Sequence, residues 1–330
     1  MKNAYSIFLS ATIVLTACGT TTTTSTNTDA EDRAVIAVSE LIVSELPEQT
    51  TALVPSAELV FPDPIPQCAI PGDVEETVES GEIDWSGNTV RATGTGVLDP
   101  DNPNVAQARL MAERAAVVVA QRNLLETVQG VRVDSETRVE NFMTDYDVIY
   151  TRVEGIVRNS RQLGPTRYDS IAGIVEVDLE MEIHSPQGLS GALSTVLGNS
   201  ETDAVSMSPQ TREFLEQYSA LVFDGSQAGL QPSMYPKIYD SNGNLLLDTK
   251  DYSSYLGSAG QTAMQFVTDF DQILAQPVFS QSPLVVNVRR VTGGFGSDIV
   301  LGQEESDTLG WLKTGLPFLM TAGRFLLNVL

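Results

Sequence analysis

The sequence predicts an α+β fold: two small domains, each an antiparallel sheet packed with helices, after a lipidated flexible N-terminal tether. Residues 175–183 alternate strictly between apolar and acidic side chains, which is typical of a half-buried strand in an antiparallel sheet. Residues 102–130 carry a helix start at Asn102 and Pro103 and a helix stop at Gly130. Hydrophobic residues make up 42% of the 330 residues, which is enough for a real core in one or two domains.

The first 17 residues are expected to be a signal peptide. Lys2 precedes an apolar stretch over residues 7–17, which is too short to span a bilayer. The end of this stretch resembles a bacterial lipobox, in which signal peptidase recognises three residues and acyl chains such as palmitate are attached at the following cysteine. The recognition residues here are Leu15, Thr16 and Ala17, and the lipidated residue is Cys18. An ordinary cleaved signal peptide with an unrelated cysteine is the alternative.

The lipobox resemblance also implies a location. Gly19 rather than an aspartate follows Cys18, and in lipoproteins this favours export to the outer membrane. Two or more acyl chains make such an anchor stable. We therefore expect a lipid-anchored protein on the outer membrane that faces the periplasm.

The second cysteine and the net charge limit which disulfides and which binding partners are expected. Lipidation of Cys18 leaves Cys68, so no intramolecular disulfide is expected despite an oxidising periplasm; an inert thiol and an intermolecular bridge are both open. The 43 acidic residues outnumber the 19 basic ones, for a formal net charge of −24. This charge argues against nucleic acid as a partner and against electrostatic attraction to anionic lipid.

Residues 18–87 are expected to form the lipidated tether. Residues 20–28 are nearly all threonine, and several prolines follow between residues 47 and 71. Neither composition supports a packed core. This tether either holds the folded part away from the membrane or wraps a neighbouring subunit.

The first domain is expected at residues 88–185. It opens with the strand pattern NTVRATGTGVL and continues into the long alanine-rich helix. Along this helix, small side chains recur every three or four residues and predict a face that packs on a sheet or contacts another subunit. This stripe consists of Val105, Ala108, Ala112, Ala115 and Val119. A shorter helix around residues 145–153 and two strands joined by GPTRYDS follow.

A serine- and glycine-rich segment, residues 186–210, is predicted to link this domain to a second α+β domain at residues 211–302. EQYSALVFDG and KIYDSNGNLLLD are typical of strands, with Asn242 and Gly243 placed for a tight type I′ hairpin turn. Apolar residues over 263–274 follow a helical period and predict an amphipathic helix. SPLVVNVRRV and SDIVLG supply two more strands.

Residues 303–330 are expected to form an apolar C-terminal helix opened by Pro317. This helix would be about 21 Å long, shorter than the roughly 30 Å hydrocarbon core of a bilayer. Because an exposed helix this apolar would aggregate, three locations are open: a core, a subunit interface and the inner face of the outer membrane. Its candidate packing or subunit-contact residues are Leu316, Leu319 and Leu326.

Few residues are arranged for catalysis. His184 is the only histidine and is expected to be solvated on the polar side of its strand. No nucleophile elbow, P-loop or C-x-x-C motif occurs, so we expect no enzyme, no cofactor and no metal. Carboxylates on one face of the strand are expected to be solvated and partly paired with arginines, with a bound cation or a bridge between subunits as alternatives. They are Glu176, Asp178, Glu180 and Glu182.

Residues 106–163 resemble the lipoprotein-20 family, and in particular its FlgP-type flagellar outer-membrane lipoproteins. The alanine-rich helix, GVRVDSETRVENF and RVEGIVRNSR carry the resemblance, and the strands of the second domain resemble a companion domain of some relatives. The resemblance implies no catalysis and a homo-oligomer that forms a periplasmic ring or disk of the flagellar motor. The long proline-rich extension and the apolar tail depart from the compact members of the family.

Two other function classes are open. A non-flagellar envelope lipoprotein would bind another periplasmic protein, and neighbouring genes would distinguish it from a flagellar one. A periplasmic hydrolase or metal-dependent enzyme would need a role for His184 or for the acidic strand face.

Overall fold

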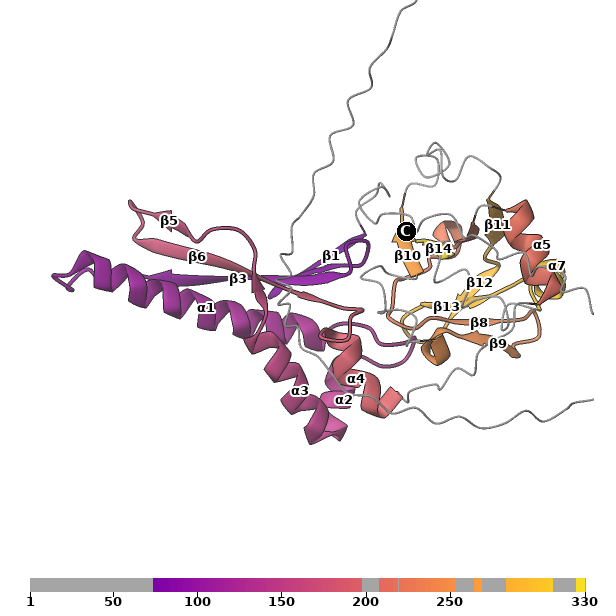
Figure 1. Cartoon of the computed structure of the whole chain (residues 1–330), viewed down its shortest axis with the longest axis horizontal. Coiled ribbons are helices and arrows are strands. Elements are labelled where there is room, and N and C mark those ends of the chain that lie inside the picture. Colours follow the sequence, from indigo (N-terminus) through magenta and orange to yellow (C-terminus); the bar gives the residue numbers. More distant parts are fainter. Residues whose placement is uncertain are drawn as a thin grey trace, which may run out of the picture. The chain divides into compact units, whose positions relative to one another are not determined.

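The computed structural model describes six stretches of the chain, and all of them belong to one compact unit. They are residues 74–197, 208–218, 220–252, 264–268, 283–310 and 325–329. The α+β class is confirmed (Figure 1). Outside the described residues lie the expected signal peptide, most of the tether, and the residues Leu15, Thr16, Ala17, Cys18, Cys68, Leu316 and Leu319.

The N-terminal lobe, residues 74–197, is built on an antiparallel sheet, as the alternating pattern predicts. The strand order is β1-β2-β3-β6-β4, and β5 also pairs with β6. The strands are β1 (Glu75–Val78), β2 (Gly81–Asp84), β3 (Thr89–Val97), β4 (Arg161–Gln162), β5 (Arg167–Asp169) and β6 (Ile174–Glu182). Because β1 and β2 lie in the segment expected as tether, the sheet begins before residue 88.

The long helix α1 (Val105–Gln129) lies along β3 and β6 (Figure 1). Its start follows from Asn104, whose side chain accepts a hydrogen bond from the Gln107 backbone N–H at 3.2 Å. This contact satisfies one of the free donors in the first turn. The helix ends at Gly130, as predicted.

Three shorter helices complete this lobe: α2 (Val139–Asp145), α3 (Asp147–Arg158) and α4 (Leu189–Leu197). One helix was expected around residues 145–153, where α2 ends and α3 begins. Part of the segment expected as a linker is α4, whose Leu189 and Leu193 side chains are fully buried. Helix α4 therefore contributes to the core.

The described part of the C-terminal lobe, residues 208–329 with gaps, contains two four-stranded sheets. One has the order β10-β14-β7-β11 and is parallel throughout; the other has the order β12-β13-β8-β9 and is mixed. The strands are β7 (Leu221–Asp224), β8 (Lys237–Tyr239), β9 (Leu245–Asp248), β10 (Met264–Val267), β11 (Leu284–Asn287), β12 (Arg290–Thr292), β13 (Asp298–Val300) and β14 (Phe325–Asn328). The helices are α5 (Pro209–Gln217) and α7 (Gln303–Thr308).

The prediction of an antiparallel sheet in the second domain is wrong for this first sheet, because β7 pairs in parallel with both β11 and β14. Two segments expected to be helical also contain strands: β10 lies within residues 263–274 and β14 within residues 303–330. Every residue of β10 and β14 is buried. A strand buried on both faces is a continuous apolar run rather than an alternating one, and periodicity alone does not distinguish it from a buried helix.

The predicted hairpin between β8 and β9 is present, but its turn is longer than predicted. A type I′ turn needs positive φ at both central residues, and of the predicted pair only Gly243 has it, at 85°. The Asp240 carboxylate instead organises the loop by accepting hydrogen bonds from the backbone N–H groups of Asn242 and Asn244 at 2.9 and 2.7 Å.

The two lobes share one hydrophobic core. The backbone N–H groups of Met234 and Tyr235 donate to the carbonyls of Arg132 and Val133 at 3.0 and 2.9 Å. These bonds join the C-terminal lobe to the segment that follows α1.

Candidate functional site

Helix α1 lies on the sheet at backbone contact distance. Its buried face is formed by a row of small side chains, Ala108, Ala112, Ala116 and Ala120, which ends at Leu124. The facing residues of β3 are glycines. A Cβ at Gly94 would collide with the Ala116 carbonyl and the Ala120 backbone, and a Cβ at Gly96 with the Ala112 carbonyl. The strand pattern alone does not reveal this role of the two glycines.

Two of the five predicted stripe residues of this helix pack on the sheet. Ala108 and Ala112 are buried as predicted, but Val105, Ala115 and Val119 are exposed. The buried row advances four residues at a time, because the helix crosses a twisted sheet, whereas the predicted stripe included a step of three. Ala115 and Val119 therefore lie beside the packing face and are exposed to solvent.

The C-terminal candidates divide between the core and the undescribed residues. Leu326 is fully buried in β14, between β10 and β7. It is thus a core residue on a strand rather than a subunit contact on a helix. Leu316, Leu319 and the lipobox residues lie outside the described part of the chain.

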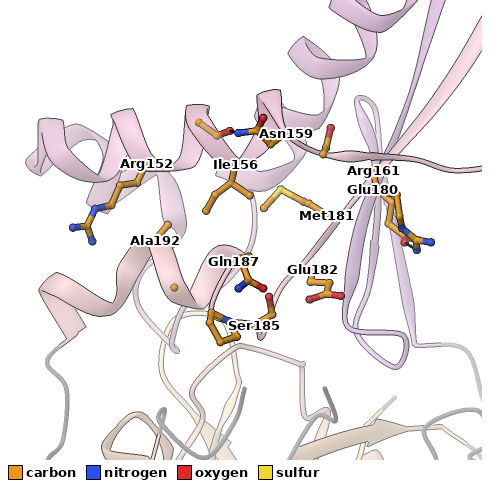
Figure 2. Close-up of a pocket in the computed structure, with 14 residues that line it drawn as sticks. Arg152, Ile156, Asn159, Arg161, Glu180, Met181, Glu182, Ser185, Gln187 and Ala192 are labelled. Atoms are coloured by element: carbon orange, nitrogen blue, oxygen red, sulfur yellow. Dashed lines mark hydrogen bonds and ion pairs between the residues drawn. The ribbon is translucent and has the colours of Figure 1, made fainter. Parts of the chain in front are cut away.

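A cleft of about 710 Å³ is lined by α3, α4 and the end of β6 (Figure 2). Figure 2 shows Arg152 at one end and Arg161 at the other, with the apolar side chains of Ile156 and Met181 between them. Arg152 donates to the Thr195 hydroxyl at 3.1 Å. The cleft therefore combines an apolar floor with a guanidinium group at each end.

Neutral polar groups also line this cleft, among them Asn159 and Gln187. The hydroxyls of Ser160 and Ser185 are buried and have no hydrogen-bond partner among the described residues. An unpaired buried hydroxyl costs free energy. With its apolar floor and these polar groups, the cleft has the chemistry for binding a peptide or another polar ligand.

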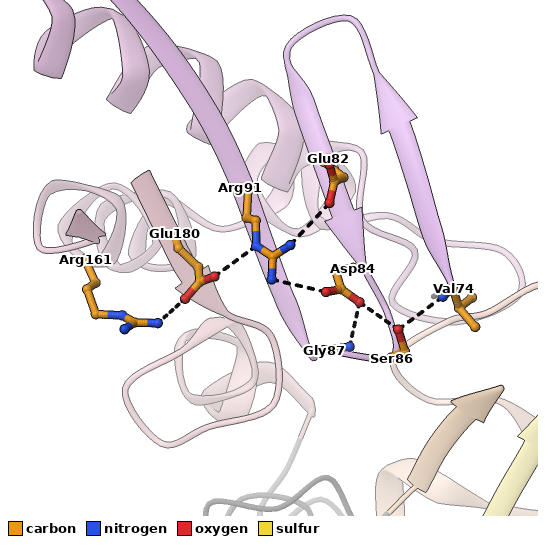
Figure 3. A network of polar contacts seen from close by, with 8 residues as sticks. All are labelled: Val74, Glu82, Asp84, Ser86, Gly87, Arg91, Arg161 and Glu180. Atoms are coloured by element: carbon orange, nitrogen blue, oxygen red, sulfur yellow. Dashed lines mark hydrogen bonds and ion pairs between the residues drawn. The ribbon is translucent and has the colours of Figure 1, made fainter. Parts of the chain in front are cut away.

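A network of ion pairs fixes one end of the cleft (Figure 3). On β3, Arg91 Nε donates to Glu180 Oε2 at 2.9 Å, and its Nη2 lies 3.2 Å from Asp84 Oδ2. Glu180 also pairs with Arg161 at the rim of the cleft. The Ser86 hydroxyl continues the network by donating to Asp84 at 2.9 Å. Burial opposes the charge of Arg91, but the hydrogen bond to Glu180 and the nearby carboxylates outweigh it and raise the Arg91 pKa.

The predicted pairing of strand carboxylates with arginines is confirmed. Arg167 on β5 pairs with Glu176 and Asp178, and its hydrogen bond is the main cause that lowers the pKa of Asp178. Glu182 is exposed. Glu180 departs from the prediction, because it is buried between two arginines rather than solvated.

The prediction that His184 is solvated is wrong. Its ring is buried and meets the Tyr235 ring edge to face, with the centroids 5.6 Å apart. Asn88 holds its backbone in place by accepting from the His184 N–H at 2.8 Å and donating to its carbonyl at 3.2 Å. The strand alternation ends at this point because the chain turns into the junction between the lobes. Burial lowers the pKa of His184 to about 4.

Among the described residues, no group of three or more histidine, cysteine, aspartate or glutamate side chains is placed to hold a metal ion. No helix in the described stretches is long and apolar enough to cross a membrane.

Comparison with known families places a match in the C-terminal lobe. Residues 220–319 match the model of the second domain of Treponema pallidum Tp0624. The matched segment starts just before β7 and extends past α7, so it contains most of the strands of the C-terminal lobe. The search of curated proteins found no match.

Proposed function

We propose that this chain is a non-catalytic lipoprotein of the outer membrane that self-associates into a periplasmic ring or disk of the flagellar motor. Cys18 carries the acyl chains, and the folded part provides the contacts between copies. A ring forms when one contact repeats around a closed circle, and a lipid on every subunit adds avidity for the membrane.

The exposed apolar surface of α1 and of the strands beside it is the observation that carries this proposal. Met111 and Val119 are exposed along the helix, and Val97 is exposed at the end of β3. Apolar side chains gathered on one region of a soluble surface mark protein interfaces. The strong net charge of −24 keeps the rest of the surface well hydrated.

Light scattering over a range of protein concentrations tests self-association. We expect the mass of the purified full-length protein to rise above that of one chain as concentration increases. A mass of one chain at every concentration would contradict the proposal.

A second candidate function is favoured by the cleft of Figure 2: a non-flagellar envelope lipoprotein that binds another periplasmic protein. A photocrosslinking residue in place of Gln187, in the cleft, tests it in the living host. Crosslinks to a different periplasmic protein favour this candidate, and crosslinks only to further copies of the chain favour the ring.

A further inference from the structure

One edge of the first sheet is open at the C-terminal end of β3. Leu98 donates to the Gly173 carbonyl and Ile183 donates to the Asn88 carbonyl, both at 2.9 Å. Because hydrogen-bonded positions alternate along an antiparallel strand, the even-numbered residues of β3 bond to β6. Its odd-numbered residues direct their backbone N–H and C=O groups to the opposite side.

Strand β2 covers only part of that opposite side. It pairs with residues 89–91 of β3, from Asp84 opposite Thr89 to Glu82 opposite Arg91. Thr95 and Val97 therefore have no strand partner within the described part of the chain, and both are exposed. Their backbone groups form a template to which another strand can add.

The two edges of this sheet differ in charge. The edge strands beside β6 carry Arg161, Arg167 and Asp169, and charged residues of this kind protect an edge from unwanted pairing. The open edge of β3 carries Thr95 and Val97, which are uncharged and β-branched. The open edge thus lacks the charges that protect the other edge and has the side chains that favour pairing.

Two hydrogen bonds of α1 show which side of the helix lies next to the open edge of β3. Asn123 donates from its side chain to the Thr93 carbonyl at 2.8 Å, and the Thr127 hydroxyl donates to the Ser80 hydroxyl, beside the start of β2, at 2.9 Å. Since side chains four residues apart share a face of a helix, the row that leads to Asn123 lies on this side.

That row consists of Met111, Ala115 and Val119, all exposed and all uncharged. On the far side of the helix, Glu113 accepts from the Thr166 hydroxyl at 2.8 Å, beside β5. The helix therefore presents an apolar row directly beside unpaired strand backbone.

We propose that this open edge of β3, together with the row of Met111, Ala115 and Val119, is the contact between two copies of the chain. The β3 edges pair antiparallel and join two sheets into one, with the two α1 helices side by side on the same face. The inference rests on the self-association in the proposed function and names its contact.

The distribution of charge favours a second copy of the chain as the partner that binds this open edge. The chain carries a net charge of −24, so two copies repel each other wherever their acidic surfaces meet. The open edge and its helix row contain no charged side chain, and a strand edge is complementary to its own copy in the antiparallel sense. A contact of this kind has twofold symmetry and gives a dimer, so a ring would be built of dimers through a second surface.

Two neighbouring valines of α1 provide a matched test. Val119, 38% exposed, lies in the row beside the open edge, and Val118, 64% exposed, points away from the sheet. Sedimentation of the full-length protein should show a dimer weakened at least about tenfold by Val119→Glu or by Thr95→Lys, since a buried charge opposes the contact and lysine blocks strand addition. Val118→Glu should leave the dimer unchanged within about twofold.

The outcomes separate this inference from the proposed function. Dimers of undiminished strength in both Val119→Glu and Thr95→Lys would overturn the contact and leave self-association standing. A wild-type protein that is monomeric at every concentration would overturn both. Circular dichroism identifies any variant that fails to fold.

A cysteine introduced at the open edge of β3 identifies, by disulfide crosslinking, the molecule that binds there. In a Cys68→Ser background, Thr95→Cys should give a disulfide-linked dimer of the chain in the periplasm, whereas Ile171→Cys, more exposed but in the turn beyond β5, should not. Thr95→Cys joined to a different protein, or an equal yield of dimer from both cysteines, would overturn the inference.

Discussion

Gly94 and Gly96 determine how closely α1 approaches β3, because neither position has room for a Cβ against the helix backbone. The sequence predicts Ala108 and Ala112 as packing residues from their spacing, and these are buried. It does not predict that their partners are glycines on a strand about twenty residues earlier. A short glycine cluster within a strand is compatible with a bulge or kink as well as with close backbone approach, and only the tertiary structure selects between them.

Gly94→Ala tests the contact between the helix and the strand. The added methyl group must displace the backbone of α1, so we expect the free energy of unfolding to fall by about 2 kcal/mol, as in other overpacked sites. Gly155→Ala, in α3, is the control, because no neighbouring atom lies within 4 Å of a Cβ added at that position. It should raise stability by roughly 0.5–1 kcal/mol through helix propensity. Urea denaturation measures both, and equal effects of the two changes would count against the packing described.

His184 gives a pH dependence with a defined sign. Burial lowers its pKa to about 4, whereas the unfolded chain has an ordinary histidine with a pKa of about 6.5. Between these values the unfolded state binds a proton that the folded state does not, so stability falls as pH drops through this window, by up to about 3 kcal/mol.

His184→Phe keeps a ring against Tyr235 and removes this proton. Since His184 is the only histidine, the difference between the wild-type and variant pH profiles isolates its contribution from that of the carboxylates. We expect the variant to lose less stability than the wild type between about pH 6.5 and 5. Parallel stability profiles from chemical denaturation would show that the folded protein accepts the proton.

At the scale of the element, a helix or strand with one exposed face is easier to predict from the sequence than one that is buried on all sides. Strand β6 is predicted closely because one of its faces is acidic, and the end of α1 is predicted because Gly130 is a local stop signal. Strands β10 and β14 are mistaken for helices because both of their faces are buried. The parallel pairing of β14 with β7 joins residues about a hundred positions apart, and no local pattern encodes it.

The ion-pair network between β2, β3 and β6 leads to a prediction for the sheet. Arg91→Ala leaves the buried Glu180 with Arg161 as its remaining partner, so we expect a loss of about 2 kcal/mol, since uncompensated buried charge is costly. Arg158→Ala removes an exposed pair with Glu154 along α3 and should cost less than about 0.5 kcal/mol. Thermal and urea unfolding report both. Similar small losses would show that the network adds little to stability.

At the scale of the whole molecule, the sequence anticipates two α+β bodies, whereas the described residues pack as two lobes on one core. The contacts that join the lobes are backbone bonds and buried rings from distant segments, such as the pair of His184 and Tyr235. A composition-based boundary does not reveal such contacts. The cleft is equally hidden from the sequence, because α3, α4 and β6 meet there only in the fold.

The central claim is that a lipid-anchored ring or disk in the periplasm depends on this chain. The most direct measurement is to delete the gene in its host, score swimming, and image the motors by electron cryotomography. Complementation with Cys18→Ala and Cys68→Ala compares the two cysteines. The account predicts that deletion and Cys18→Ala abolish swimming and remove a periplasmic disk, while Cys68→Ala restores both. Normal swimming with intact motors in the deletion strain would contradict it.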